Sequence, residues 1–523
     1  MIQVSTSADI TIPAISVTEF ILQRTAHFID KPALIDGPSG RTYTYQQFRD
    51  AIQTVAGNLA ARGFGKGDVF AIYSPNLPEY AIAFHGIALA GGIVTTANPL
   101  YTADELAHQI EDSGAVYLLT ISIFLDKAQE AAQKTGIKEI FTFDEVAGAT
   151  PFAALLKPGV SAPNVTIDSH EDLIVLPYSS GTTGLPKGVM LTHYNIVANI
   201  CQVEGMDDVE VTTENDVIIG VLPFFHIYGM VVIMNMALVT GATIVTMPRF
   251  DMEQFLSLIQ QHKITRANLV PPIILGLAKH PAVDNYDLSS LEFITSGAAP
   301  LGEDLSLSCG SRLDCLITQG YGLTETSPVT HINPYVAEKI RHGSAGLTIP
   351  NTETKIADLN SGKALPPGEN GEVWIRGPQV MKGYLNNPEA TAATVDEDGW
   401  LHTGDIGHFD QDGYLFVVDR LKELIKYKGF QVAPAELEAI LLTNPAIADA
   451  AVIPSPDDEA GEIPKAFVVL KDEITPDEIM AFVADQVAPH KKIRKLEITD
   501  EIPKSLSGKI LRRVLVDRER GNV

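Results

Sequence analysis

Cysteine and tryptophan are scarce in this sequence of 523 residues, which contains three cysteines and two tryptophans. Cys201, Cys309 and Cys315 are too few for a disulfide framework, and their spacing does not suit a metal site. A small disulfide-bonded secreted domain and a zinc module are therefore excluded. The N-terminal "MIQVSTSADITIPA" has no signal-peptide pattern and the C-terminal "RERGNV" no peroxisomal tripeptide, so we expect a cytoplasmic protein.

Positive charge is also in short supply. The chain has 38 lysines and arginines against 65 aspartates and glutamates, a formal net charge of −27, which opposes nonspecific binding to nucleic acid or anionic membranes. The last fifth differs, because residues 420–523 contain 16 basic and 18 acidic residues whereas residues 1–419 contain 22 and 47. Either small domains simply vary in charge, or this segment supplies the local basic patch that a polyanionic small-molecule substrate needs.

Only one hydrophobic run is long enough to cross a bilayer. Between Asp216 and Arg249 the single ionisable residue is His226. Pro223, Gly229 and Gly241 divide this run into segments typical of a strand, a helix and a strand. We therefore predict a buried βαβ unit and no membrane insertion.

The remaining patterns indicate an α/β protein of at least two domains. Apolar strands alternate with helical patterns over residues 30–120 and again to about residue 330, and a capping box at Thr102 opens one of these helices. Short strands with dense turn residues occupy about 343–418. We expect a large N-terminal domain (1–419) of two α/β sheet subdomains plus a small antiparallel or β-barrel subdomain, a small mobile α+β C-terminal domain (420–523), and a hinge at 419–422.

The stretch "SSGTTGLPKG" at residues 179–188 combines glycines, hydroxyl residues and a lysine, and it indicates phosphate binding. It is not the P-loop of nucleotide hydrolases, because Lys187 follows a proline and precedes a glycine. The next residues, "VMLT", favour a strand over a helix. We predict a glycine-rich phosphate loop between two strands.

Two further motifs carry oxygen ligands. "GYGLTE" places Thr324 beside Glu325, a hydroxyl and a carboxylate that can hold Mg²⁺ next to a phosphate; the alternative is a solvated turn. In "HTGD", Asp405 is placed to accept hydrogen bonds from a ribose, although an aspartate after a glycine is also a common turn former.

Two basic motifs lie in the last fifth. "DRLKELIKYKGFQ" contains Arg420, Lys422, Lys426 and Lys428; on a helix Lys422 and Lys426 would share a face, and a solvated stripe is the alternative. In "PKSLSGKILRR", Lys509 follows a flexible turn, or else it caps a basic terminal helix. Together the motifs suit attack by a carboxylate on the α-phosphate of ATP, a reaction that needs cations and positioning but no general base.

These motifs resemble, in the same order, those of the adenylate-forming superfamily of acyl-CoA synthetases, luciferases and amino-acid-activating enzymes. "LPFFHIYGM" and "SGAAPLGEDL" are most similar to 4-coumarate-CoA ligases. The resemblance implies a two-step reaction with ATP, Mg²⁺ and coenzyme A. A small-molecule carboxylic acid and ATP give acyl-AMP and pyrophosphate, and coenzyme A then displaces AMP to form the thioester.

The resemblance also implies roles for individual residues. The catalytic residues would be Lys509, which bridges the carboxylate and the α-phosphate, Lys426 at the adenylate, and His226 as a base toward the thiol. Glu325 and Thr324 would hold the metal. The ATP and AMP contacts would be Ser179, Ser180, Gly181, Thr182, Thr183, Lys187, Gln319, Gly320, Tyr321, Thr324, Asp405, Arg420, Lys422 and Gln431.

For the second step the resemblance implies a rotation of the C-terminal domain that withdraws Lys509 and brings in Lys428 and Gly429, with Arg249 at a coenzyme A phosphate. The acyl pocket would be formed by Tyr228, Val232, Gly297, Ala298, Ala299, Gly320, Pro328 and Val329. Val232 replaces a smaller or hydroxylated residue of the plant enzymes. We expect 4-coumarate or a related aromatic acid as substrate, with a medium-chain fatty acyl-CoA synthetase or a luciferase-like oxygenase as the alternatives. The oligomeric state is not predicted.

Overall fold

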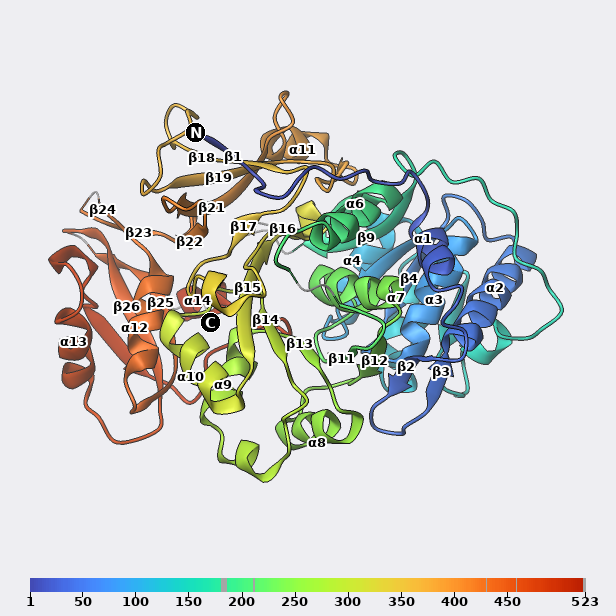
Figure 1. Cartoon of the computed structure of the whole chain (residues 1–523), viewed down its shortest axis with the longest axis horizontal. Helices are drawn as coiled ribbons and strands as arrows, with labels where there is room; N and C mark the ends of the chain where they lie inside the picture. Colours follow the sequence, from blue (N-terminus) through green and yellow to red (C-terminus); the bar gives the residue numbers. More distant parts are fainter. Residues whose placement is uncertain (180–185, 210–211, 429, 458, 521–523) are drawn as a thin grey trace.

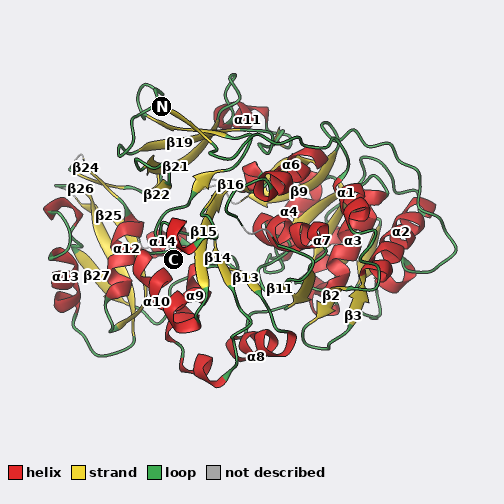
Figure 2. Cartoon of the chain, viewed as in Figure 1, coloured by secondary structure: helices red, strands yellow, loops and turns green. Residues whose placement is uncertain are grey.

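The computed structural model describes residues 1–179, 186–209, 212–428, 430–457 and 459–520. Two large sheets with their helices form the blue to yellow part of the chain in Figure 1, a smaller sheet lies at the top, and an orange to red domain lies at the left. In Figure 2 the helices, in red, lie against the strands, in yellow, of the large sheets. The predicted mixed α/β architecture is confirmed.

One large sheet has eight strands. In spatial order they are β20 (Gly383–Tyr384), β10 (Lys187–Thr192), β9 (Leu173–Ser179), β5 (Ile93–Ala97), β4 (Val69–Tyr73), β6 (Ala115–Thr120), β7 (Glu139–Thr142) and β8 (Thr150–Pro151). The strands from β9 to β8 are parallel, and β10 and β20 add antiparallel pairings at one edge. All five residues of β4 are buried, as expected for a parallel strand covered on both faces.

The other large sheet has nine strands. In spatial order they are β17 (Leu347–Thr348), β16 (Val329–Ile332), β15 (Leu316–Gly322), β14 (Phe293–Ser296), β13 (Arg266–Leu269), β11 (Val217–Gly220), β12 (Thr243–Thr246), β2 (Pro32–Asp36) and β3 (Thr42–Thr44). The strands from β15 to β2 are parallel. The carboxyl ends of β13, β14 and β15 therefore meet at one edge, where ligands bind in open α/β sheets.

Helices cover both large sheets. They are α1 (Val17–Arg24), α2 (Tyr45–Ala61), α3 (Pro78–Leu89), α4 (Ala103–Ser113), α5 (Leu125–Gln133), α6 (His193–Glu204), α7 (Met236–Thr240), α8 (Met252–His262), α9 (Pro271–Lys279), α10 (Glu303–Leu313) and α11 (Pro388–Thr394). One continuous apolar core joins the two sheets. α3 lies deep in it, because every residue from its first, Pro78, to Ala88 is buried. The predicted capping box opens α4, where Thr102 and Glu105 exchange hydrogen bonds.

The long hydrophobic run forms the predicted βαβ unit. β11 pairs in parallel with β12, and the crossover between them consists of the π-helical segment η3 (Tyr228–Asn235) and α7. Pro223 lies before the crossover and Gly241 ends it as a left-handed cap. Within the described residues, no helix is both long and apolar enough to span a bilayer.

The small upper sheet is antiparallel, as predicted. Its order is β1 (Ile2–Val4), β18 (Glu353–Ala357), β19 (Gly371–Arg376), β21 (Leu401–Phe409) and β22 (Leu415–Arg420). The described pairings form an open order and do not close a barrel. Its first strand comes from the N-terminus, a pairing across about 350 residues that the sequence patterns did not indicate.

The last domain begins after a turn at residues 421–424. It contains β23 (Ile425–Tyr427), β24 (Phe430–Val432), α12 (Pro434–Thr443), β25 (Ile447–Asp457), β26 (Gly461–Leu470), α13 (Pro476–Ala484), β27 (Lys495–Ile498) and α14 (Arg512–Glu519). The helix that we considered for the motif at residues 419–431 does not form, so that interpretation is wrong. The motif forms the end of β22, a turn and the β23–β24 hairpin, because Arg420 pairs with Asp405 and Tyr427 pairs with Phe430.

Candidate active site

The phosphate motif lies between two strands, as predicted. Ser179, the last residue of β9, pairs with Lys187, the first residue of β10. Ser180, Gly181, Thr182 and Thr183 lie outside the described residues. The ends of the loop thus enter and leave the sheet at the same point, which fixes the positions of its two terminal side chains.

The Glu325 carboxylate meets this loop. Glu325 lies in a single turn, η5 (Thr324–Thr326), directly after β15. Its Oε1 accepts a hydrogen bond from Ser179 Oγ at 3.0 Å and another from the Tyr384 hydroxyl at 2.9 Å. Lys187 Nζ lies 4.3 Å from the centroid of the Tyr384 ring. The metal-ligand candidate and the phosphate lysine are therefore held by one tyrosine.

A second carboxylate, that of Asp405, contacts β15 through Tyr321. Asp405 on β21 is buried and accepts a hydrogen bond from the Tyr321 hydroxyl at 2.6 Å. Arg420 on β22 lies opposite, with Nε 3.3 Å from Asp405 Oδ1. Burial raises the pKa of Asp405, and the Arg420 cation opposes this rise. The Asp405 carboxylate is thus paired with Arg420 and can accept hydrogen bonds from hydroxyl groups.

Gln319, predicted to contact AMP, uses its side chain within the protein. Its Oε1 accepts from the Leu301 backbone N–H at 2.6 Å, and its Nε2 donates to the Ser344 carbonyl at 3.1 Å. The side chain thus ties the loop after β14 to the segment before β17. Gly320, the next residue, packs closely against β16, since an added Cβ would lie only 3.3 Å from the His331 carbonyl oxygen.

The Lys509 loop reaches this site from the far end of the chain. Ser505 closes the loop, because its N–H donates to the Lys509 carbonyl and its hydroxyl accepts from the Lys509 N–H. Gly508, with a φ of +75°, packs against the N-terminal part: a Cβ there would lie 2.9 Å from Val270 and 3.3 Å from Pro272. The tip of the loop is therefore docked at the carboxyl end of β13.

The electrostatics show which groups surround Lys509. The pKa of Lys509 is lowered to about 8: burial is the largest cause, the Arg420 cation adds to it, and the Glu423 and Asp405 carboxylates oppose both effects. The structure thus brings together Lys509, Asp405, Arg420 and Tyr321, which are separated by up to 188 positions in the sequence.

His226 faces the same space. Burial, and then the Lys509 cation, lower the pKa of His226 to about 4, so the ring is neutral at pH 7. Its Nδ1 accepts a hydrogen bond from the Tyr228 N–H at 3.3 Å. The ring proton is therefore on Nε2, so Nε2 is a hydrogen-bond donor in this tautomer.

Several predicted acyl-pocket residues lie together at the carboxyl edge of the nine-stranded sheet. Tyr228 donates from its hydroxyl to the Thr295 carbonyl at 2.9 Å, and its ring lies over Gly297, where an added Cβ would be 2.7 Å from Cε1. Val232 and Val329 pack in one apolar cluster. Ala298 and Ala299 follow in the loop after β14, and Pro328 precedes β16. The Tyr228 ring therefore packs directly against Gly297, a contact that any larger side chain at 297 would prevent.

Two sets of predicted residues are not brought to this site: the ATP and adenylate contacts Lys422, Lys426 and Gln431, and the second-step residues Lys428 and Arg249. Lys426 and Gln431 face each other across the β23–β24 hairpin, and both are exposed, as are Lys422 and Arg249. Lys428 is exposed too and pairs with Glu459, with Nζ and Oε1 2.6 Å apart. Gly429 lies outside the described residues. In Figure 1 this hairpin lies at the outer edge of the red domain, away from β15.

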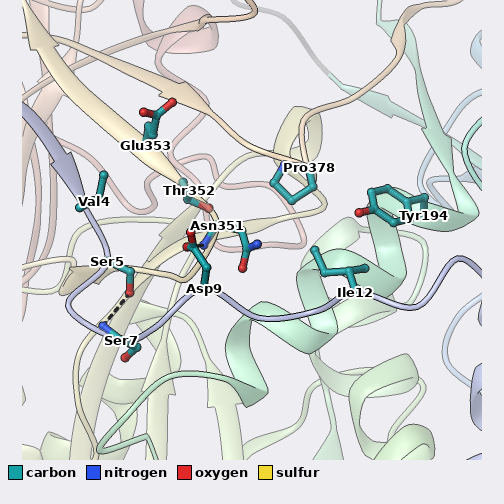
Figure 3. Close-up of a pocket in the computed structure, with 10 residues that line it drawn as sticks. All are labelled: Val4, Ser5, Ser7, Asp9, Ile12, Tyr194, Asn351, Thr352, Glu353 and Pro378. Carbon is teal, nitrogen blue, oxygen red and sulfur yellow. Dashed lines mark hydrogen bonds between the residues drawn. The ribbon is translucent and has the colours of Figure 1, made fainter.

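A cavity of about 590 Å³ lies elsewhere, where the N-terminal arm crosses the upper sheet. Figure 3 shows its lining, which includes Asp9, Asn351 and Glu353 and no predicted site residue. The Asn351 N–H donates to Asp9 Oδ1 at 3.1 Å, and Asn351 Oδ1 accepts from the Ile10 N–H at 2.9 Å. Its polar groups therefore secure the arm to the body of the protein.

Comparisons with known proteins find similar families, relatives and structures. Residues 22–385 match the "AMP-binding enzyme" family model, and residues 436–509 match the "AMP-binding enzyme C-terminal domain" model. The chain is 46% identical over 497 residues to 4-coumarate–CoA ligase 2 of Petroselinum crispum, covering 93% of this chain and 91% of that protein. It also resembles the structure of the anthranilate CoA ligase AuaEII with anthranoyl-AMP, at a TM-score of 0.89, 26% identity and 98% coverage of both chains.

Two structures of MatB from Rhodopseudomonas palustris differ in how well they match. The ATP-bound structure gives a TM-score of 0.87 and the apo structure 0.77, both at 28% identity and with 96% of this chain and 99% of theirs covered. At equal identity and coverage, the chain therefore superposes better on the ATP-bound structure than on the apo structure.

Proposed function

Since the chain belongs to the AMP-binding enzyme family, a member of the adenylate-forming superfamily, we propose that it is an ATP-dependent carboxylate–CoA ligase acting on 4-coumarate or a related aromatic acid. The observation that carries the proposal is the docking of the Lys509 loop, which brings Lys509 close to Asp405 and Arg420. The match to two curated 4-coumarate–CoA ligases extends over 95% and 93% of this chain, which supports the proposal.

In the first step a carboxylate oxygen of the acid attacks the α-phosphorus of ATP, and the bond to pyrophosphate breaks. Asp405 accepts hydrogen bonds from the ribose, and Lys187 with the loop that it closes holds the leaving phosphates. Lys509 lies between the carboxylate and the α-phosphate, where its cation offsets charge in the transition state. Its partial desolvation strengthens that interaction because water no longer screens it.

Glu325 fits a role toward Mg²⁺. Its Oε1 takes two hydrogen bonds, while Oε2 accepts none from the described residues, and a free carboxylate oxygen is the donor that Mg²⁺ prefers. The described residues contain no group of three or more ligating side chains, which suits an ion held chiefly by substrate phosphates. Bound there with Thr324, it would neutralise charge on phosphate oxygens.

In the second step the thiol sulfur of coenzyme A attacks the carbonyl carbon of acyl-AMP, and AMP leaves. We propose that residues 420–523 rotate about 419–422, so that the Lys509 loop withdraws and the hairpin with Lys426, Lys428 and Gln431 enters. The exposure of that hairpin and its distance from β15 support this proposal. His226 then lies between acid and thiol as a neutral Nε2–H donor, which weakens the predicted role as a base.

The nature of the acid rests on the pocket. The similarity to 4-coumarate–CoA ligases supports an aromatic substrate, whereas the apolar cluster of Val232 and Val329 favours a medium-chain fatty acid as the second candidate. A cytoplasmic location is part of the proposal and fits three free thiols.

The proposal is tested by AMP formation with ATP and coenzyme A across benzoic, cinnamic and C4 to C12 alkanoic acids. We expect the highest kcat/KM with hydroxycinnamic acids and a thioester as the product. Fast turnover of alkanoates beside slow turnover of cinnamates would replace the aromatic assignment, and oxygen-dependent light emission without thioester would overturn the ligase.

A further inference from the structure

Tyr384 lies in a segment that carries none of the recognised motifs. It is the second residue of β20, which pairs with β10 on the side away from β9. The flanking backbone is tied to both halves of the site: the Leu385 N–H donates to the Gly188 carbonyl at 2.8 Å, and the Met381 N–H donates to the Glu325 carbonyl at 2.9 Å. This short segment therefore bridges the phosphate loop and the turn that carries Glu325.

The side chain of Tyr384 makes two separate contacts. Its hydroxyl donates to Glu325 Oε1 at 2.9 Å, and Lys187 Nζ lies 4.3 Å from its ring centroid. The ring is buried at 6% exposure, and the Tyr384 N–H is held by Thr391 Oγ1 at 2.9 Å. Burial raises the pKa of the Tyr384 hydroxyl, so the phenol stays a donor at neutral pH.

We propose that Tyr384 is a positioning residue that sets two groups at once: its hydroxyl orients the Glu325 carboxylate toward Mg²⁺, and its ring holds the Lys187 ammonium toward the ATP phosphates. Together with Ser179, the hydroxyl occupies Oε1 and leaves Oε2 for the cation. A cation over an aromatic face keeps its charge and loses side-chain freedom, so Lys187 is preorganised for phosphate. The inference rests on the proposed function.

The two contacts are separable by substitution. Tyr384→Phe removes the hydroxyl and keeps the ring, whereas Tyr384→Leu removes both. Tyr414→Phe is the matched control, because the Tyr414 hydroxyl also donates a hydrogen bond, to the Lys339 carbonyl at 2.7 Å, and Arg341 lies over its ring at 5.2 Å. This second pair lies outside the site and contacts none of the groups in question.

The experiment is calorimetric binding of ATP to the full chain, without acid, in Mg²⁺ and in EDTA. For Tyr384→Phe we expect ATP affinity to fall about tenfold in Mg²⁺ and to be unchanged in EDTA. Only the hydrogen bond to the Glu325 carboxylate is lost, and in the proposal this carboxylate affects ATP only through Mg²⁺. For Tyr384→Leu we expect a further loss of about threefold that appears in EDTA as well. Tyr414→Phe should match the unmodified protein in both conditions.

Equal loss for Tyr384→Phe in Mg²⁺ and EDTA, or no loss in either, would overturn the inference. A Glu325→Gln variant sharpens the result. If the Tyr384 hydroxyl acts through Glu325, adding Tyr384→Phe to Glu325→Gln should lower ATP affinity in Mg²⁺ only slightly further. Losses of affinity that add fully in the double variant would contradict the inference. Absence of ATP binding by the unmodified protein would instead overturn the proposed function. The two failures are thus distinguishable.

Discussion

The C-terminal domain has two lysine-bearing segments that differ in almost every physical respect. The Lys509 loop is docked on the N-terminal part, and burial lowers the pKa of its lysine to about 8. The β23–β24 hairpin is exposed, and a hydrogen bond with the Glu459 carboxylate raises the pKa of Lys428. Lys509 thus lies in a desolvated site, whereas Lys428 forms a solvated ion pair with Glu459.

This difference fits the proposal that one small domain serves two steps. In the proposed mechanism the docked lysine acts on ATP in this arrangement, and the rotation precedes contact between the other lysine and the adenylate. The better match to ATP-bound than to apo MatB is consistent with that interpretation. The two segments should therefore respond differently to substitution, one half-reaction at a time.

The largest effect is expected for Lys509→Ala. Loss of the cation beside the α-phosphate should slow pyrophosphate release from ATP and the best acid by about 10²- to 10³-fold. The control is Lys504→Ala in the same loop, whose lysine pairs with Asp449 at 2.6 Å outside the site. Equal pyrophosphate release by Lys509→Ala and the unmodified enzyme would contradict the role of the docked segment.

Asp405→Asn comes next and probes the groups that face Lys509. The amide can no longer neutralise Arg420, and it is a weaker acceptor for the ribose, so we expect the KM for ATP to rise about tenfold or more. Asp412→Asn is the control, because Asp412 forms an exposed pair with Arg341 at 2.6 Å. An unchanged KM for Asp405→Asn would show that this carboxylate is only structural.

The pH dependence offers a test without a change of sequence. The pKa of Lys509 is lowered to about 8, so the lysine is charged below that pH and loses its proton above it. We expect kcat/KM for ATP in pyrophosphate release to fall about tenfold per unit above pH 8. Lys509→Arg should abolish this alkaline limb, since arginine stays protonated; an identical limb in that variant would assign it to another group.

Lys428→Ala should have the smallest effect on the first step. We expect unchanged pyrophosphate release and about tenfold slower conversion of acyl-AMP to thioester, because a single cation near the adenylate is lost. Lys134→Ala is a matched control: both lysine side chains are 43% exposed and both pair with acidic residues. A parallel loss in both half-reactions would mean that the hairpin also serves adenylation.

Local signals in the sequence predicted much of this structure. The capping box at Thr102, the strands on both sides of "SSGTTGLPKG" and the βαβ unit depend on neighbouring residues, so their patterns suffice. The pairing of β1 with β18 joins residues about 350 positions apart through backbone hydrogen bonds, which leave no side-chain pattern. The helix considered for residues 419–431 was wrong because strand pairing with distant residues holds this segment: Arg420 pairs with Asp405, and Tyr427 pairs with Gly461.

The site was predictable in kind but not in detail. Lys509, Asp405 and Glu325 stand in recognisable motifs, whereas Tyr384 lies in "MKGYLNN" and gains its contacts only when β20 joins β10. The lowered pKa of Lys509 arises mainly from burial when its own loop docks on the N-terminal part of the chain. Neither the contacts of Tyr384 nor the lowered pKa of Lys509 follows from a pattern of nearby residues, so the tertiary structure was needed to reveal them.

The most direct test of the division between the two segments uses Lys509→Ala in the second half-reaction alone. Synthetic acyl-AMP and coenzyme A are supplied, and thioester formation is followed in a single turnover. We predict a rate within about twofold of the unmodified enzyme, since the docked lysine withdraws before this step. A loss as large as that in pyrophosphate release would contradict the account, because Lys509 would then act in both steps and no rotation would be required.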